Sequence, residues 1–167
     1  TLVGGLSGDA LTTGGENVAL GYSALSTDDV GSHSVAVGPY ALQNQNFATA
    51  TDTYNTGVGY NAGGGITTGI QNTFVGGLAG DALTDADYNT AVGYGALSTD
   101  TLGSYSTAIG RHALNQQNFT TATNSFNTAV GYSAGEAITT GTRNTFVGGA
   151  AGDGTDDGAD NTAVGYD

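Results

Sequence analysis

One pentapeptide in this 167-residue chain has the pattern of a catalytic serine. Residues 131–135 read Gly-Tyr-Ser-Ala-Gly, which matches the G-x-S-x-G turn that exposes the nucleophile of many hydrolases. That turn joins a strand to a helix and works with a histidine and a carboxylate from elsewhere in the chain. Here the same turn position is Ser23, Asn61 or Gly95 in other copies of a repeat, and no helical pattern follows. We therefore predict a turn serine, no catalytic residue and no enzymatic activity.

Three aspartates have a spacing that could suit a metal ion. Asp9, Asp81 and Asp153 each follow a glycine-rich turn and occupy the same position in successive copies of a 72-residue block. Glycine–aspartate turns bind calcium in nonapeptide repeats, but there the copies follow one another directly. We expect structural turns, no metal and no cofactor. The alternative is a divalent cation such as calcium, held by a ring of these carboxylates around a three-fold axis.

The charge balance excludes several classes of partner. The formal net charge is −13, from 15 acidic and 2 basic side chains, so the chain cannot neutralise the phosphates of a nucleic acid or of an anionic membrane. No apolar run reaches the roughly 18–20 residues of a membrane span, and the absence of cysteine leaves the compartment open. We expect solvated carboxylates in the return loops at Asp28, Asp29, Asp100, Asp156 and Asp157.

The elements that must position these residues are copies of one repeat. The pentad Asn-Thr-Ala-Val-Gly and its variants recur along the whole chain, and their closing glycines mark a 17-residue coil and a longer, 21-residue coil. Three short coils and one long coil make up the 72-residue block, after which the order of coil lengths repeats. The closing glycines are Gly4, Gly21, Gly38, Gly59, Gly76, Gly93, Gly110, Gly131, Gly148 and Gly165.

This period predicts an all-β parallel β-solenoid, or β-roll. A 17-residue unit is too short for a helix pair, whereas Thr-x-Val before glycine is typical of a short strand. Residues 1–167 would form one repetitive segment. Because the chain starts without methionine inside a motif, we expect this segment to be a window of a longer fibre.

The alternation of side chains along each strand predicts an inner and an outer face. We expect the second and fourth pentad positions to fill a narrow interior, and the third, usually alanine, to point outward. An outward apolar stripe indicates an interface, so we predict a homotrimer. The interchain residues would be Leu2, Ala19, Ala36, Phe74, Ala91, Ala108, Ala129, Phe146 and Ala163.

The two 21-residue coils carry a longer, amide-rich excursion. Binding function often lies in loops on a rigid scaffold, and amides beside an aromatic ring suit a glycan, so a cell-surface glycan or protein receptor is a possible partner. The alternative is a loop that packs on a neighbouring chain. The candidate recognition residues are Asn44, Asn46, Phe47, Gln116, Asn118 and Phe119.

Threonine pairs in the same coils raise a different binding function. Residues 49–51 and 121–123 read Thr-Ala-Thr, as in the threonine ranks of ice-binding solenoids. An ice-binding surface needs a threonine rank on every coil, whereas these pairs occur on one coil in four. We therefore do not expect ice binding from them.

The pentads also resemble a known family. Residues 17–21, 34–38 and 106–110 are similar to the repeats in the heads of YadA-like trimeric autotransporter adhesins, and residues 89–97 resemble repeats of phage tail fibre proteins even more closely. The resemblance implies a left-handed β-roll assembled as an extracellular trimer. The first expectation is a structural segment of a phage tail fibre, or similar appendage, that gives reach and presents a surface for attachment. The alternative is the head of a bacterial adhesin that binds a host or environmental surface.

Overall fold

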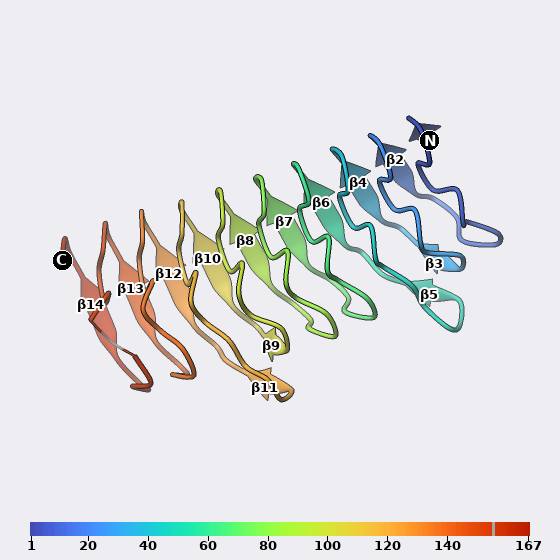
Figure 1. Ribbon diagram of the computed structural model, residues 1–167. Helices are drawn as coiled ribbons and strands as arrows, with labels where there is room; N and C mark the ends of the chain where they lie inside the picture. The colour runs from blue at the N-terminus through green and yellow to red at the C-terminus, as the bar shows by residue number, and fades with distance from the viewer. Residues whose placement is uncertain (155) are drawn as a thin grey trace.

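The fold is a β-solenoid of about ten turns. The computed structural model describes residues 1–154 and 156–167, and Figure 1 shows the coils stacked in one row from the N-terminus to the C-terminus. Within these residues the chain forms only strands and turns, which confirms the predicted all-β solenoid. Each coil adds one strand to a ten-stranded parallel sheet: β1 (Leu2–Val3), β2 (Val18–Leu20), β4 (Val35–Val37), β6 (Thr56–Val58), β7 (Thr73–Val75), β8 (Thr90–Val92), β10 (Thr107–Ile109), β12 (Thr128–Val130), β13 (Thr145–Val147) and β14 (Thr162–Val164).

The register of the sheet confirms the two coil lengths. Ala19 pairs with Ala36 across a short coil, whereas Thr107 pairs with Thr128 across a long one. Both long coils also form a small second ladder at the far end of the loop, where Figure 1 shows them extending beyond their neighbours. These two-stranded sheets are β3 (Gly31–Ser32) with β5 (Thr51–Asp52), and β9 (Gly103–Ser104) with β11 (Thr123–Asn124).

The predicted inner and outer faces of the strand are the wrong way round. The middle residue of each pentad points into its own coil, where Ala19, Ala91 and Phe74 are fully buried in the single chain. The flanking residues lie on the outside: Leu20 is 46 % and Ile109 39 % exposed. The predicted interchain stripe is therefore a core column, fully or almost fully buried at Ala19, Ala36, Phe74, Ala91, Ala108, Ala129 and Phe146, and only partly covered on the terminal coils at Leu2 and Ala163.

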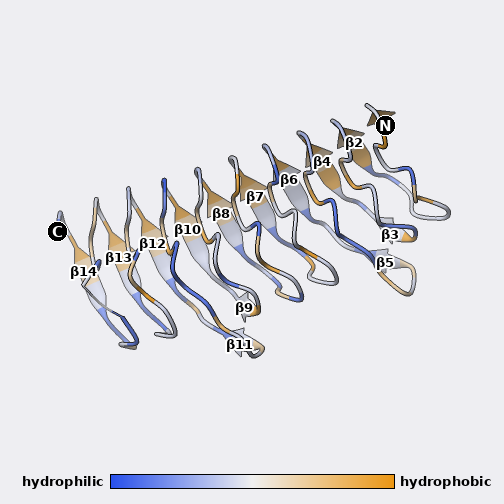
Figure 2. Cartoon of the chain, viewed as in Figure 1, coloured by the Kyte–Doolittle hydropathy of each residue, from blue (hydrophilic) through white to orange (hydrophobic). Residues whose placement is uncertain are grey.

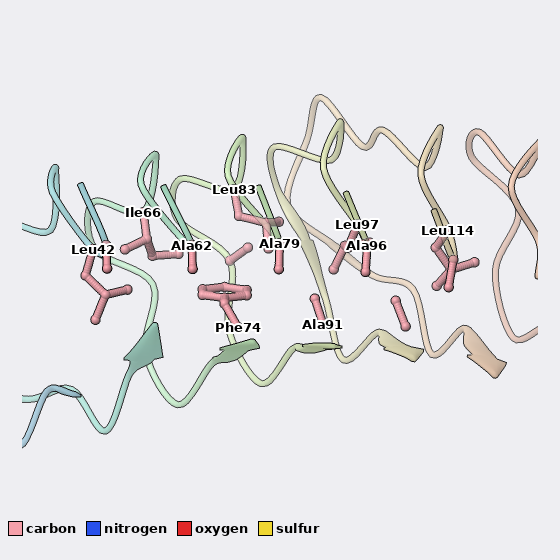
Figure 3. Packing of buried hydrophobic residues seen from close by; sticks show 14 of the residues in the cluster. Leu42, Ala62, Ile66, Phe74, Ala79, Leu83, Ala91, Ala96, Leu97 and Leu114 are labelled. Atoms are coloured by element: carbon pink, nitrogen blue, oxygen red, sulfur yellow. The ribbon is translucent and has the colours of Figure 1, made fainter. Parts of the chain in front are cut away.

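A second alanine and one larger residue complete the interior of each coil between Gly21 and Gly148, and Figure 3 shows several of these coils. Two core positions, four and seven residues after the closing glycine, vary together. Two consecutive coils carry Leu25 and Leu42 at the first position, and the next two carry Gly63 and Gly80. In those two coils the second position becomes Ile66 and Leu83, both fully buried. The four-coil period is therefore a period of core packing.

Phe74 explains the glycines in this alternation. A Cβ atom on Gly63 would lie 2.4 Å from Cδ2 of the Phe74 ring, and one on Gly80 would lie 2.4 Å from its Cε1. The ring therefore fills the volume that two missing leucines leave on adjacent coils. Phe146 occupies the same place between Gly135 and Gly152. The aromatic residue therefore fills a gap inside the coil.

The closing glycines form a column in which backbone stacks directly on backbone. Gly76 has φ +132°, and a Cβ there would lie 2.6 Å from the carbonyl oxygen of Gly93 on the next coil. Only glycine combines this φ with so close an approach. The presence of glycine at every closing position therefore follows from the stacking of the coils.

Candidate interaction surface

The described residues enclose no pocket and contain no cluster of metal-ligating side chains. None of the described residues belongs to a helix that could cross a bilayer. The surface with the most regular chemistry is the outside of the ten-stranded sheet, where Figure 2 shows hydrophobic residues recurring on successive strands.

Two rows of side chains cover this outer sheet face. In each pentad, one outward side chain comes directly before the buried middle residue and another comes directly after it. We call the stacks of these side chains the Thr row and the Val row, and the strand register aligns each row from coil to coil. Neither row contains an acidic or basic side chain. The Thr row is Thr1, Val18, Val35, Thr56, Thr73, Thr90, Thr107, Thr128, Thr145 and Thr162; the Val row is Val3, Leu20, Val37, Val58, Val75, Val92, Ile109, Val130, Val147 and Val164.

A column of residues with left-handed backbone conformation borders the face on the side where the strands begin. We call it the leading-edge row; all its members have φ between 51° and 62°. Its central rings stack, with centroids 4.7 Å apart for Tyr88–Tyr105 and 5.2 Å for Tyr105–Phe126. The row consists of Glu16, His33, Tyr54, Gln71, Tyr88, Tyr105, Phe126, Arg143 and Asp160.

Charged pairs lie towards the two ends of this row. Nε2 of His33 lies 3.2 Å from Oε2 of Glu16, and its Nδ1 lies 3.1 Å from Oδ1 of Asp52. Arg143 donates two hydrogen bonds to the carboxylate of Asp160, at 2.6 and 2.7 Å. The hydrogen bonds from Arg143 lower the pKa of Asp160 and raise that of Arg143 itself. Arg143 and Asp160 therefore form a local ion pair between adjacent coils.

A second row borders the face where the strands end. We call it the trailing-edge row, and it contains the first residue after each closing glycine. Tyr22 and Tyr60 each meet Tyr40, one position further along its coil, edge to face at centroid distances of 5.6 and 5.8 Å. The row consists of Gly5, Tyr22, Pro39, Tyr60, Gly77, Tyr94, Arg111, Tyr132, Gly149 and Tyr166.

The long coils position a buried polar cluster and not an aromatic tip. Phe47 and Phe119 are only 6 % and 5 % exposed, so the prediction that they are exposed is wrong. Asn44, Asn46 and Gln116 do lie on the surface, and Asn118 is half-buried. Gln45 and Gln117 occupy the core position seven residues after the closing glycine and are fully buried there, and the amide-rich sequence gave no indication that only this amide would turn inward.

Gln45 is the centre of the first cluster. Its Nε2 donates to Oδ2 of Asp28 at 2.6 Å and to Oγ of Ser34 at 2.8 Å, and its Oε1 accepts from Nδ2 of Asn55 at 2.9 Å. Gln117 repeats these bonds with Asp100, Ser106 and Asn127. Asp28 and Asp100 are fully buried, which corrects the expectation that they are solvated. The exposed Asp156 and Asp157 agree with it.

The opening asparagines explain why a glutamine is needed. In most coils this asparagine is buried, accepts from the backbone of the next coil and donates to a carbonyl; Asn72 donates to Ala86 at 2.8 Å and accepts from Asn89 at 2.9 Å. Serine replaces it at Ser34 and Ser106. The serine lacks the amide, and the glutamine of the long coil supplies one.

The structure keeps the three aspartates considered for a metal ion apart from one another. Asp9 and Asp153 are exposed and Asp81 is half-buried, and successive members of the three lie four coils apart. The chain alone therefore brings no two of them together. Oδ1 of Asp81 has no hydrogen-bond partner among the described residues, and burial raises the pKa of this carboxyl. Ser133 lies in a turn with φ 50° and donates its backbone N–H to the carbonyl of Arg111.

Comparison with known proteins adds no relative to this description: no family model, no curated protein and no solved structure matches the chain.

Proposed function

We propose that this chain is a rod-like segment of a trimeric extracellular fibre, a phage tail fibre or similar appendage, which gives reach and presents a surface for attachment. The single observation that carries the proposal is the uncharged outer sheet face on a chain of net charge −13. The family resemblance of the pentads supports it, and implies a left-handed roll.

The size of this face fits an interface between chains. Ten coils at ~4.8 Å and about five residues across each pentad at ~3.3 Å give a surface of roughly 45 by 15 Å, or about 700 Å². A stable protein interface takes about 800 Å² from each partner. Except for Leu20, the side chains of the Thr and Val rows are β-branched, and they are in register, so they can pack as one layer without burying charge.

The width of the face favours three copies. Three faces about 15 Å wide, closed into a triangular prism, each lie about 4–5 Å from the axis, which is half of the ~10 Å between packed sheets. Four such faces lie about 7–8 Å from the axis and leave an open channel lined by valine. The predicted trimer therefore keeps its place in the proposal, although the residues first assigned to its interface lie in the core.

A charged side chain on the face tests this proposal. Thr107→Glu on the Thr row should reduce the mass measured by light scattering from three chains to one, because three carboxylates would meet near the axis. Thr99→Glu on the exposed return loop is the matched control and should leave the trimer intact. A wild-type chain that is monomeric at all concentrations contradicts the proposal.

The bacterial alternative uses the same rod. An adhesin head would also be a trimer of β-rolls, so the face does not distinguish the two. A C-terminal membrane β-barrel anchor in the same gene product would favour the adhesin, and a virion-attachment or chaperone domain would favour the fibre.

One observation favours a second function for the outer sheet face. Seven consecutive coils, from β6 to β14, carry threonine in the Thr row, in register with one another. The absence of a threonine rank on every coil was the reason not to expect ice binding, and these coils supply such a rank at a different position. A flat array of hydroxyls and methyls at ~4.8 Å steps could order water into an ice-like layer if the face is free. Thermal hysteresis by a monomeric chain, abolished by Thr107→Glu, would support this function; a trimer without hysteresis excludes it.

A further inference from the structure

We propose that neighbouring copies meet edge to edge at the same height, so that Gln71 and Arg143 of one copy lie over Gly77 and Gly149 of the next. This inference rests on the proposed function, since it names the contacts that close the trimer. It specifies that the copies run in the same direction with no axial shift.

The first observation is that the single chain does not require these two glycines. A Cβ on Gly77 would lie 3.5 Å from Cδ2 of Tyr94, an ordinary contact, and one on Gly149 would lie 3.5 Å from Tyr166. Neither glycine has positive φ. The adjacent Gly76 differs, because its Cβ would lie 2.6 Å from a backbone oxygen. Gly77 therefore leaves room for something outside its own chain.

The second observation is the residue at the opposite edge of the same coil. Gln71 and Arg143 each lie six residues before one of these glycines. Gln71 is exposed, and its amide makes no hydrogen bond to any described residue. It also interrupts a column that is otherwise aromatic at Tyr54, Tyr88 and Tyr105. The leading-edge row thus offers a long polar side chain at the two heights where the trailing-edge row has none.

Within one chain these two edges cannot meet, because the strand separates them by about six residues of ~3.3 Å each. In a closed ring of three faces, the leading edge of each copy adjoins the trailing edge of the next. With no axial shift, Gln71 faces Gly77, and Tyr105 faces Arg111, a pair suited to a cation–π contact. A shift by one coil would place Gln71 against Tyr60 or Tyr94 instead.

Cysteine cross-linking tests the register, and the chain has no cysteine of its own. The variant Gln71→Cys with Gly77→Cys should form a covalent closed trimer under mild oxidation. Each bridge must be intermolecular, because a disulfide needs Cα atoms within about 7 Å. The matched control, Gln71→Cys with Tyr94→Cys, tests a shift of one coil and should form no covalent trimer. All these positions vary between coils, so the variants should keep the wild-type circular dichroism spectrum.

Three outcomes overturn the inference, and they differ from one another. A trimer by light scattering whose 71/77 cysteines stay reduced contradicts the edge contact but leaves the proposed function standing. Cross-linking through the 71/94 pair contradicts the common height. A monomeric wild-type chain contradicts both proposals.

As a second measurement, Gly77→Tyr should weaken the trimer at least about tenfold by overpacking, and adding Gln71→Ala should restore most of that loss.

Discussion

The two four-coil blocks of this chain, residues 17–88 and 89–160, agree inside and differ outside. The buried amide of Gln45 lies 2.6 Å from Asp28, and that of Gln117 lies 2.6 Å from Asp100. The leading-edge row has the same backbone in both blocks, with φ 62° at His33 and 61° at its counterpart, Tyr105. Yet the first block places histidine between carboxylates, where the second stacks aromatic rings.

The interior therefore determines the repeat, whereas the residues of the edge rows need only contact their equivalents on the next coil. Core positions tolerate a change only when a neighbour changes with it, as Phe74 and its two glycines show. At the edge an ion pair and an aromatic pair are interchangeable, because each joins one coil to the next at about the same distance.

Removing the aromatic plug should have the largest effect. Phe74→Ala should lower the free energy of unfolding by about 3–5 kcal/mol, because it leaves a cavity between two glycines. Adding Gly80→Leu should recover most of this loss, since Leu97 holds the same position on the next coil with φ 53°. Urea unfolding at a fixed protein concentration measures both. A double variant no more stable than Phe74→Ala would contradict the account of the four-coil period.

Deleting the buried amide should lower the free energy of unfolding nearly as much, and by the same amount in the two blocks. Gln45→Ala leaves Oδ2 of the buried Asp28 without its partner and removes one hydrogen bond each from Ser34 and Asn55, which should lower the free energy of unfolding by about 3 kcal/mol or more. Gln117→Ala should cost the same within about 1 kcal/mol. Urea unfolding of the two variants side by side provides the test. A large effect in one block only would show that the interiors are not equivalent.

Exchanging side chains of the leading-edge row should change the free energy of unfolding only slightly. The triple variant Glu16→Tyr, His33→Tyr and Asp52→Asn replaces the ion pairs around His33 with the residue types that stand 72 positions later in the chain. We expect the free energy of unfolding to change by less than about 1 kcal/mol, because exposed ion pairs and stacked rings have similar small values. A thermal melt measures the change. A loss as large as that of Gln45→Ala would refute the division between interior and edge.

The smallest effect should come from Asp81. Burial raises the pKa of this carboxyl, so its ionised form destabilises the fold at neutral pH, and the fold gains stability as pH falls through the raised pKa. Asp81→Asn should therefore raise the melting temperature at pH 7, and the gain should vanish below the ordinary pKa of an aspartate, about 4. Asp153→Asn, at the exposed equivalent position, should change nothing at either pH.

The sequence predicts the number and length of the coils because the glycine column has a strict geometric cause. It could not assign the faces of the strand. In a three-residue strand, the β-branched residues point to one side and the alanine to the other, whichever side faces the core. Alanine suits either a core or an interface. The available signal was the joint change of Phe74 with Gly63 and Gly80, which only a shared interior explains. The burial of Asp28 and Gln45 gave no signal, because each residue alone is typical of a surface.

Distances between spin labels test the central claim, a parallel trimer with its sheet faces inward, most directly. Thr27→Cys and Thr99→Cys place single nitroxide labels on exposed loops of equivalent coils in the two four-coil blocks, away from the outer sheet face. The account predicts three coupled spins per assembly and the same interspin distance at both heights. No interspin distance at either site would contradict the trimer, and a distance that differs between the sites would contradict the common direction and height of the three chains.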